Sequence, residues 1–293
     1  MVNSFLRYIS FEKRYSQHTV KSYQNDLAQF EHYCQEKFQT KELVEASQLM
    51  VRSWILSLMD SGISSRSVNR KIASLRSFYK FLLKREEINR DPTSKIKSLK
   101  IKKDLPGFAN EIEFLDFLNS VEFEKSFNGI MEQIILELLY GTGIRLSELI
   151  GLKIKDFHPM ESTIKVLGKR NKERIIPVSR SLNELLKNYI TEKNHVFPHD
   201  QSSYLIVNKY GGQAYPMMIY RTVKKYLSQV QSLDKKSPHA LRHTFATHLL
   251  NKGADLNAVK DLLGHSSLAA TQVYTHNSLE KLKSVFDQAH PKA

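Results

Sequence analysis

Six side chains in the C-terminal two thirds of the chain could together do chemistry on a phosphate ester. Two guanidinium groups can grip non-bridging phosphate oxygens with bidentate geometry. Imidazoles can accept or donate a proton near neutral pH, an ammonium can protonate a departing alkoxide, and a phenol can attack phosphorus. The residues are Arg145, Lys169, His239, Arg242, His265 and Tyr274. Chemistry of this kind requires no metal.

The positions of these residues support that interpretation as a set, although not one by one. Arg145 follows a Gly-Thr-Gly turn at a helix start, where unpaired backbone N–H groups favour an anion. His239 and Arg242 are three residues apart at another helix start, within about 60° on one face. Singly, such residues are commonly surface charges, caps or packing groups. Only their combination points to phosphodiester chemistry.

Five segments resemble the catalytic boxes of one enzyme family, the tyrosine site-specific recombinases, also called the phage-integrase family. They are GTGIRLSELIGL (141–152), GKRNKERIIPV (168–178), HALRHTFATHLL (239–250), LLGHSS (262–267) and TQVYTH (271–276). Their order and spacing make the signal far more specific than a single H-x-x-R. The resemblance is strongest to the bacterial XerC and XerD type and extends over the whole chain.

The resemblance assigns all six residues to the family's catalytic positions. It implies that Tyr274 attacks the scissile phosphate and forms a 3′-phosphotyrosyl link, while Arg145 and Arg242 hold the non-bridging oxygens. It further implies proton-transfer and hydrogen-bonding roles for the remaining groups. His239 assists deprotonation of the tyrosine, Lys169 protonates the leaving 5′-oxygen, and His265 donates to the phosphate.

The same resemblance implies the reaction and its partners. The covalent link conserves the bond energy, so we expect neither ATP nor another cofactor, and the chain contains no G-x-x-x-x-G-K-[ST] loop. The partners implied are a double-stranded recombination site and a tetramer, formed with itself or with a second recombinase, that passes through a Holliday junction. We expect resolution of chromosome dimers at a dif-like site, with a septal DNA translocase as an optional activator. A mobile-element integrase is the alternative.

The elements that must position these residues are mainly helical, with a small β-sheet (α+β). The basic segment around Pro106 and Gly107 marks a boundary. We therefore expect a helical core-binding (SAM-like) domain at 1–98, a linker at 99–108, and a catalytic domain at 109–293 with a C-terminal tail that docks on a protomer. The resemblance implies that the two domains form a clamp around DNA.

A long helix expected at residues 65–85 carries the chain's most basic face. Its apolar arc consists of Val68, Ile72, Leu75, Phe78, Tyr79 and Leu82. The opposite arc consists of Arg66, Arg70, Arg76, Lys80 and Lys84, with no acid between Arg66 and Arg85. A solvated charged face is the simplest explanation, but like charges repel unless an anion lies beside them. We predict that these five residues bind the DNA phosphate backbone.

In the second domain, residues 162–168 and 174–178 read as two strands of a hairpin with a basic tip. Residues 204–207 read as a third strand. Helices are expected near 221–227, 239–250, 256–263 and 267–274. In the tail, Leu279, Leu282 and Phe286 recur at helical spacing. The tail could dock on its own domain or on a neighbouring protomer, and the sequence does not distinguish the two.

Composition limits the class of protein. The chain has 293 residues, and 44 Lys and Arg against 30 Asp and Glu give a net charge of +14, which favours a polyanion. Nucleic acid is the commonest such partner, although an anionic membrane surface would also fit. The single cysteine, Cys34, forms no internal disulfide. Without a stretch long enough to span a membrane, we expect a cytoplasmic protein.

Three other functions fit part of the pattern. His239 and His243, four apart, could bind zinc, but the Glu of H-E-x-x-H is missing. A non-catalytic architectural DNA-binding protein would explain the charge but not six intact catalytic positions. A type IB topoisomerase, which relaxes supercoiled DNA, would use the same phosphotyrosyl chemistry for a different task. The length, without an extra arm-binding domain, favours a simple recombinase.

Overall fold

The computed structural model describes residues 1–40, 42–101, 111–168, 172–198, 202–233, 235–264, 286 and 288–289. The chain divides into two units, Met1–Asp104 and Leu105–Ala293, each with its own hydrophobic core. Most of the predicted linker, 99–108, lies outside the described residues. None of the described helices combines the length and apolar character needed to cross a bilayer.

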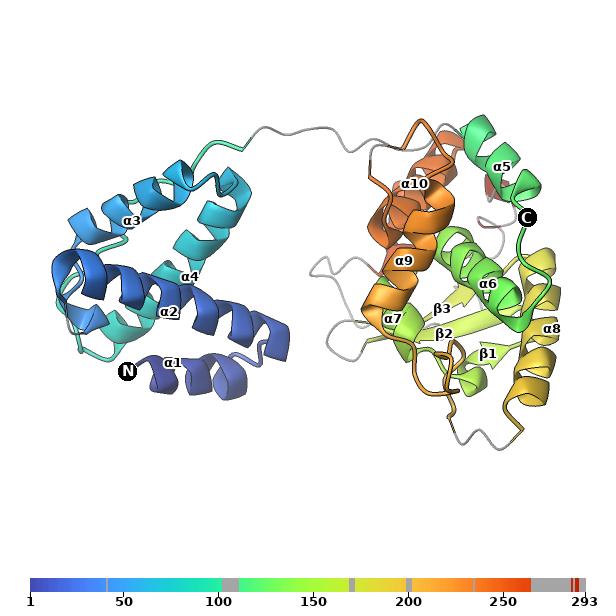
Figure 1. Cartoon of the computed structure of the whole chain (residues 1–293), viewed down its shortest axis with the longest axis horizontal. Coiled ribbons are helices and arrows are strands. Elements are labelled where there is room, and N and C mark those ends of the chain that lie inside the picture. Colours follow the sequence, from blue (N-terminus) through green and yellow to red (C-terminus); the bar gives the residue numbers. More distant parts are fainter. Residues whose placement is uncertain are drawn as a thin grey trace. The chain divides into compact units, whose positions relative to one another are not determined.

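Helices form the first unit, drawn in blue to cyan in Figure 1. The helices are α1 (Val2–Arg7), which continues as a π-helical turn at Tyr8–Glu12, α2 (Gln17–Phe38), α3 (Gln48–Asp60) and α4 (Ser65–Lys84), with a 3₁₀ turn at Leu43–Glu45. The side chains of Ser16, Ser47 and Ser64 each accept a hydrogen bond from the backbone N–H three residues later, which fixes where α2, α3 and α4 begin.

The core of this unit confirms the predicted apolar arc of α4. Its six members, Val68, Ile72, Leu75, Phe78, Tyr79 and Leu82, are all at most 1% exposed. They pack with apolar residues of α2 and α3, where Phe30 and Trp54 have ring centroids 4.9 Å apart. Burial of this face leaves the basic arc of α4 on the other side of the helix.

The second unit contains an antiparallel sheet that is small, as predicted. Its strands are β1 (Phe157–His158), β2 (Thr163–Leu167) and β3 (Glu173–Pro177), in the order β1-β2-β3. The expected hairpin of β2 and β3 is confirmed, with Ile164 opposite Ile176. The third strand was predicted at the wrong place. Residues 204–207 form only isolated bridges, from Tyr204 to Lys153 and from Val207 to Gln213.

Most of the second unit is helical (Figure 1). Its helices are α5 (Glu111–Ser120), α6 (Phe127–Thr142), α7 (Leu146–Gly151), α8 (Arg180–Val196), α9 (Pro216–Leu227), α10 (Pro238–Asn251) and α11 (Leu256–Leu263), with a 3₁₀ turn at Ile154–Asp156. Helix α6 contacts α8, α9 and α10, while α7 contacts β2 and α11 contacts β3. The predicted α+β class is therefore confirmed. The helix expected at 267–274 lies outside the described residues.

Two described residues of the tail lie in the core of the second unit. Phe286 is fully buried and Ala289 is 2% exposed, and both belong to the core formed by residues of the second unit. Leu279 and Leu282 lie outside the described residues.

Candidate active site

Arg145 stands at the start of α7, as the Gly-Thr-Gly turn predicts. Helix α6 ends at Gly143, whose φ of +59° favours glycine. A Cβ there would lie 2.4 Å from the ring of Phe245, so close approach also demands glycine. The backbone N–H of Arg145 donates to Glu148 Oε2 at 2.8 Å, so the acid three residues later satisfies a backbone donor at the start of α7.

Glu148 is a buried carboxylate shared by two arginines. Its Oε1 accepts from Arg145 Nη1 at 2.7 Å and from Arg174 Nη1 at 2.9 Å, and its Oε2 accepts from Arg174 Nη2 at 2.8 Å. Burial alone would raise the pKa of Glu148. The hydrogen bonds and charge of Arg174, with the hydrogen bonds from Arg145, outweigh burial and lower this pKa to about 2. Glu148 is therefore ionised at neutral pH.

Arg242 comes from the first turns of α10, which is capped by the side chain of Ser237. Arg242 is 6% exposed. Its guanidinium bridges two carbonyls: Nη1 donates to Gly143 O and Nη2 donates to Leu263 O, each at 2.5 Å. Burial, followed by the charges of Arg145 and Arg174, lowers the pKa of Arg242 to about 10. Arg242 stays a cation at neutral pH, in a place where a nearby anion would stabilise it.

The C-terminal end of α11 gathers the arginines. Arg174 Nε donates to Leu262 O at 2.8 Å, Arg242 Nη2 to Leu263 O, and Arg145 Nη2 to Gly264 O at 3.0 Å. Carbonyls at a helix C-terminus lack intrahelical partners and form the negative end of the helix dipole, so they attract cations. Among the described residues, this cluster joins three guanidiniums to one carboxylate and carries two excess positive charges. It is suited to bind a phosphate.

The structure brings together two of the six predicted residues, Arg145 and Arg242, through neighbouring carbonyls of one helix end. His239 lies on the exposed side of the first turn of α10. Lys169, His265 and Tyr274 lie outside the described residues.

Glu148 and Arg174 belong to the cluster but were not predicted. Two signals could have found them. An acid three residues after a helix start is the acidic half of the capping-box pattern. Arg174 alternates with Ile176 on the buried face of β3, and a charged residue on such a face requires a charged partner.

The basic arc of α4 has a more complex role than its sequence suggests. Arg66, Lys80 and Lys84 are exposed. Arg70, whose side chain is 47% exposed, pairs with the buried carboxylate of Asp26, with Nη2 at 2.9 Å from Oδ1. Arg76 donates to Ile96 O and so also holds the segment after the helix. The anion beside Arg70 comes from α2, which the sequence of α4 alone does not reveal.

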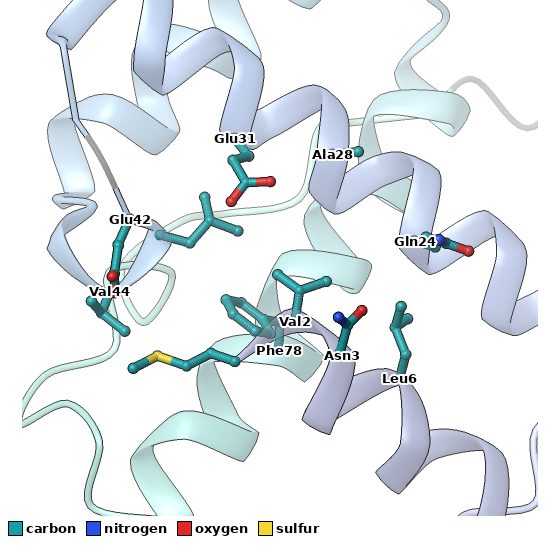
Figure 2. A pocket seen from close by; sticks show the side chains of 11 residues that line it. Val2, Asn3, Leu6, Gln24, Ala28, Glu31, Glu42, Val44 and Phe78 are labelled. Carbon is teal, nitrogen blue, oxygen red and sulfur yellow. The ribbon is translucent and has the colours of Figure 1, made fainter.

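The first unit contains a cavity of about 560 Å³ whose lining differs from that of the arginine cluster (Figure 2). Apolar side chains of α1, α2 and the Leu43–Glu45 turn contribute to its lining, among them Val2, Leu6 and Val44. The described residues that line it include the carboxylates of Glu31 and Glu42 and neither Lys nor Arg. This cavity therefore does not suit a polyanion.

The buried ion pairs of Glu148 predict acid sensitivity. A pKa of 4.5 in the unfolded chain and about 2 in the folded chain means that the contribution of Glu148 to stability is complete above pH 4.5 and is lost as pH falls towards 2. The loss amounts to about 3 kcal/mol. Urea unfolding of the wild type and Glu148→Gln at pH 2 to 7 measures it, because the difference in unfolding free energy between them should shrink by that amount.

Glu184→Gln provides the control, since Glu184 is an exposed partner of Lys187 on α8. Its difference from wild type should change by less than about 1 kcal/mol over the same range. An equal pH response in both variants would contradict the assignment to Glu148.

Both units of the chain match domains of known proteins. Residues 110–281 match the model of the phage integrase family, and residues 2–86 match that of the phage integrase N-terminal SAM-like domain. A tyrosine recombinase XerC of Chlorobaculum parvum is 37% identical, with 99% of this chain and 94% of that protein covered. A tyrosine recombinase XerD of Staphylococcus haemolyticus is 35% identical, with 100% and 99% covered.

Two solved structures share the fold. The XerH site-specific recombinase bound to a palindromic difH substrate, in a post-cleavage complex, gives a TM-score of 0.73 at 23% identity, with 97% of this chain and 83% of that chain covered. The Tn1549 transposon integrase in complex with transposon right end DNA gives a TM-score of 0.71 at 21% identity, with 97% and 98% covered.

Proposed function

Because the chain belongs to the phage integrase family and is a tyrosine recombinase, which cleaves and rejoins DNA strands, we propose that its arginine cluster is the phosphate site of that reaction. The observation that supports this proposal most directly is that Arg145 and Arg242 both donate to carbonyls at the end of α11, in a cluster with two excess positive charges. A transition state with charge on the non-bridging oxygens is stabilised by guanidiniums already held in place.

The proposed reaction uses all six predicted residues. Tyr274 attacks phosphorus, a 3′-phosphotyrosyl bond forms, and the 5′-oxygen leaves with a proton from Lys169. His239, exposed at the start of α10, assists removal of the phenolic proton, and His265 donates a hydrogen bond to the phosphate. The 5′-hydroxyl of a partner strand then attacks the phosphotyrosyl bond and releases the tyrosine.

We propose site-specific recombination at a dif-like site, with resolution of chromosome dimers in the cytoplasm, as the biological role. The support is the XerC and XerD relatives and the fold shared with the XerH complex on difH. The two domains would clamp DNA in a tetramer, alone or with a second recombinase, and a septal translocase would be an activator. The fold shared with the Tn1549 integrase keeps a mobile-element role as the second candidate.

A nicked suicide duplex tests the proposal. After attack, the short strand beyond the nick diffuses away, so a covalent protein–DNA adduct should accumulate and run as a slower band on a denaturing gel. Sequencing of trapped genomic DNA would identify the site, and a site within an element rather than at the chromosome terminus would favour the second candidate. The absence of any adduct with cognate DNA would contradict the proposed function.

The exposed basic residues of α4 predict a salt-dependent DNA contact. Arg66→Ala and Lys80→Ala should each weaken binding and reduce the slope of log K against log salt by about one, because each removes one phosphate contact. Fluorescence anisotropy with a duplex at several salt concentrations measures the slope. Arg70→Ala should also destabilise the fold, since Asp26 would lose a partner.

Arg52→Ala is the matched control, because Arg52 is exposed on α3 and lies outside the basic arc. It should leave the slope unchanged. If Arg66→Ala and Arg52→Ala change the slope equally, α4 is not the phosphate-binding helix.

A further inference from the structure

We infer that Arg174, on strand β3, is a positioning residue that holds both phosphate-binding arginines in place without touching the phosphate. The inference rests on the proposed function of Arg145 and Arg242. Arg174 is not one of the six catalytic positions, so this role is an addition to theirs.

The contacts of Arg174 use its guanidinium on two sides. Nη1 and Nη2 form a fork on the two oxygens of Glu148, and Nε donates to Leu262 O. A lysine ammonium is a point charge and cannot make a planar fork and a third, separately directed bond. Only 5% of the Arg174 side chain is exposed, so its charge acts from beneath the surface.

Two glycines border the guanidinium of Arg174. A Cβ at Gly264 would lie 3.1 Å from Arg174 Nη1, and a Cβ at Gly168 would lie 3.5 Å from the same atom. The group therefore lies between two glycines, one at the end of α11 and one at the end of β2. A side chain at Gly264 would press against the guanidinium and disturb its contacts.

Two chains of contact lead from Arg174 to the phosphate-binding arginines. Through Glu148 it reaches Arg145, which donates to the same carboxylate. Through Leu262 O it holds the end of α11, whose next two carbonyls accept from Arg242 and Arg145. Loss of Arg174 would free both supports, and it would also leave Glu148 to offset Arg145 alone, which halves the excess positive charge.

The test compares cleavage of two suicide duplexes, one with an ordinary scissile phosphate and one with a methylphosphonate there. The variants are Arg174→Lys and the charge-neutral pair Glu148→Gln with Arg174→Met, whose folding is checked by thermal melting. On the ordinary duplex we expect single-turnover cleavage to fall by about 10²-fold, with DNA affinity within about twofold of wild type.

The methylphosphonate separates positioning from general damage. It lacks one anionic oxygen, so alignment of the guanidiniums matters less and the defect should shrink to about threefold. Lys165→Met is the control, since Lys165 is on β2 of the same hairpin, half-exposed and 3.4 Å from Glu173. It should cleave both duplexes like wild type.

Two results would overturn the inference: wild-type cleavage by both variants, or an equal defect on both duplexes. If Arg174→Lys does not fold, the paired variant decides alone, and if neither folds while Lys165→Met does, Arg174 is a folding residue and the inference fails. Failure of the proposed function is distinguishable, because the wild type itself would then form no adduct.

Discussion

Tyr274→Phe is expected to abolish the covalent DNA adduct and to leave DNA affinity unchanged. The substitution removes only the phenolic oxygen, which the proposed reaction uses as its nucleophile. Loss of a nucleophile is among the largest single effects known in enzymes, and we expect a drop of about 10⁵-fold or more. Adduct formation is measured on a nicked suicide duplex, and DNA affinity is measured separately by fluorescence anisotropy.

Tyr220→Phe is the matched control for this experiment. Tyr220 is 40% exposed on α9, so the loss of its hydroxyl should disturb neither the core nor the arginine cluster. It should form adduct at the wild-type rate. An adduct that persists in Tyr274→Phe and disappears in Tyr220→Phe would show that the nucleophile is misassigned.

Much of the fold follows from periodic patterns in the sequence. The apolar arc of α4 is visible because a helix of 20 residues repeats its pattern several times. The β2–β3 hairpin is visible because its apolar strands flank a basic tip. The strand β1 has only two residues, too short to show alternation, whereas Leu205, Ile206 and Val207 form a buried apolar run that periodicity cannot distinguish from a strand.

The candidate site was predictable where a motif or a helix start marks it, as at Arg145 and Arg242. Its supports were not predictable, because they depend on contacts between distant segments. Glu148 and Arg174 are 26 residues apart and Arg145 and Gly264 are 119 apart. Similarly, Asp26 on α2 lies 44 residues from Arg70. Such pairs arise only when helices and strands pack, and no local pattern encodes them.

Arg242→Met is expected to lower the rate of adduct formation by about 10³-fold while DNA affinity changes little, because a buried donor to the phosphate is lost. Arg242→Lys tests a finer consequence of burial. Burial and two neighbouring cations lower the pKa of Arg242 from 12.5 to about 10. A lysine ammonium starts from a lower pKa of about 10.4, and the same burial and neighbouring cations should lower it further, towards neutral pH.

Cleavage by Arg242→Lys should therefore depend on pH in a way that the wild type does not. The lysine should lose its proton at a lower pH than the arginine does, so the ratio of variant to wild-type rate should fall as pH rises from 7 to 9. Single-turnover rates at each pH give this ratio, and division by the wild-type rate removes the ionisation of Tyr274, which both proteins share. Lys165→Met, on the β2–β3 hairpin, supplies a flat reference profile. A flat ratio for Arg242→Lys would mean that the neighbouring cations do not act on residue 242, and the electrostatic account of the cluster would then be wrong.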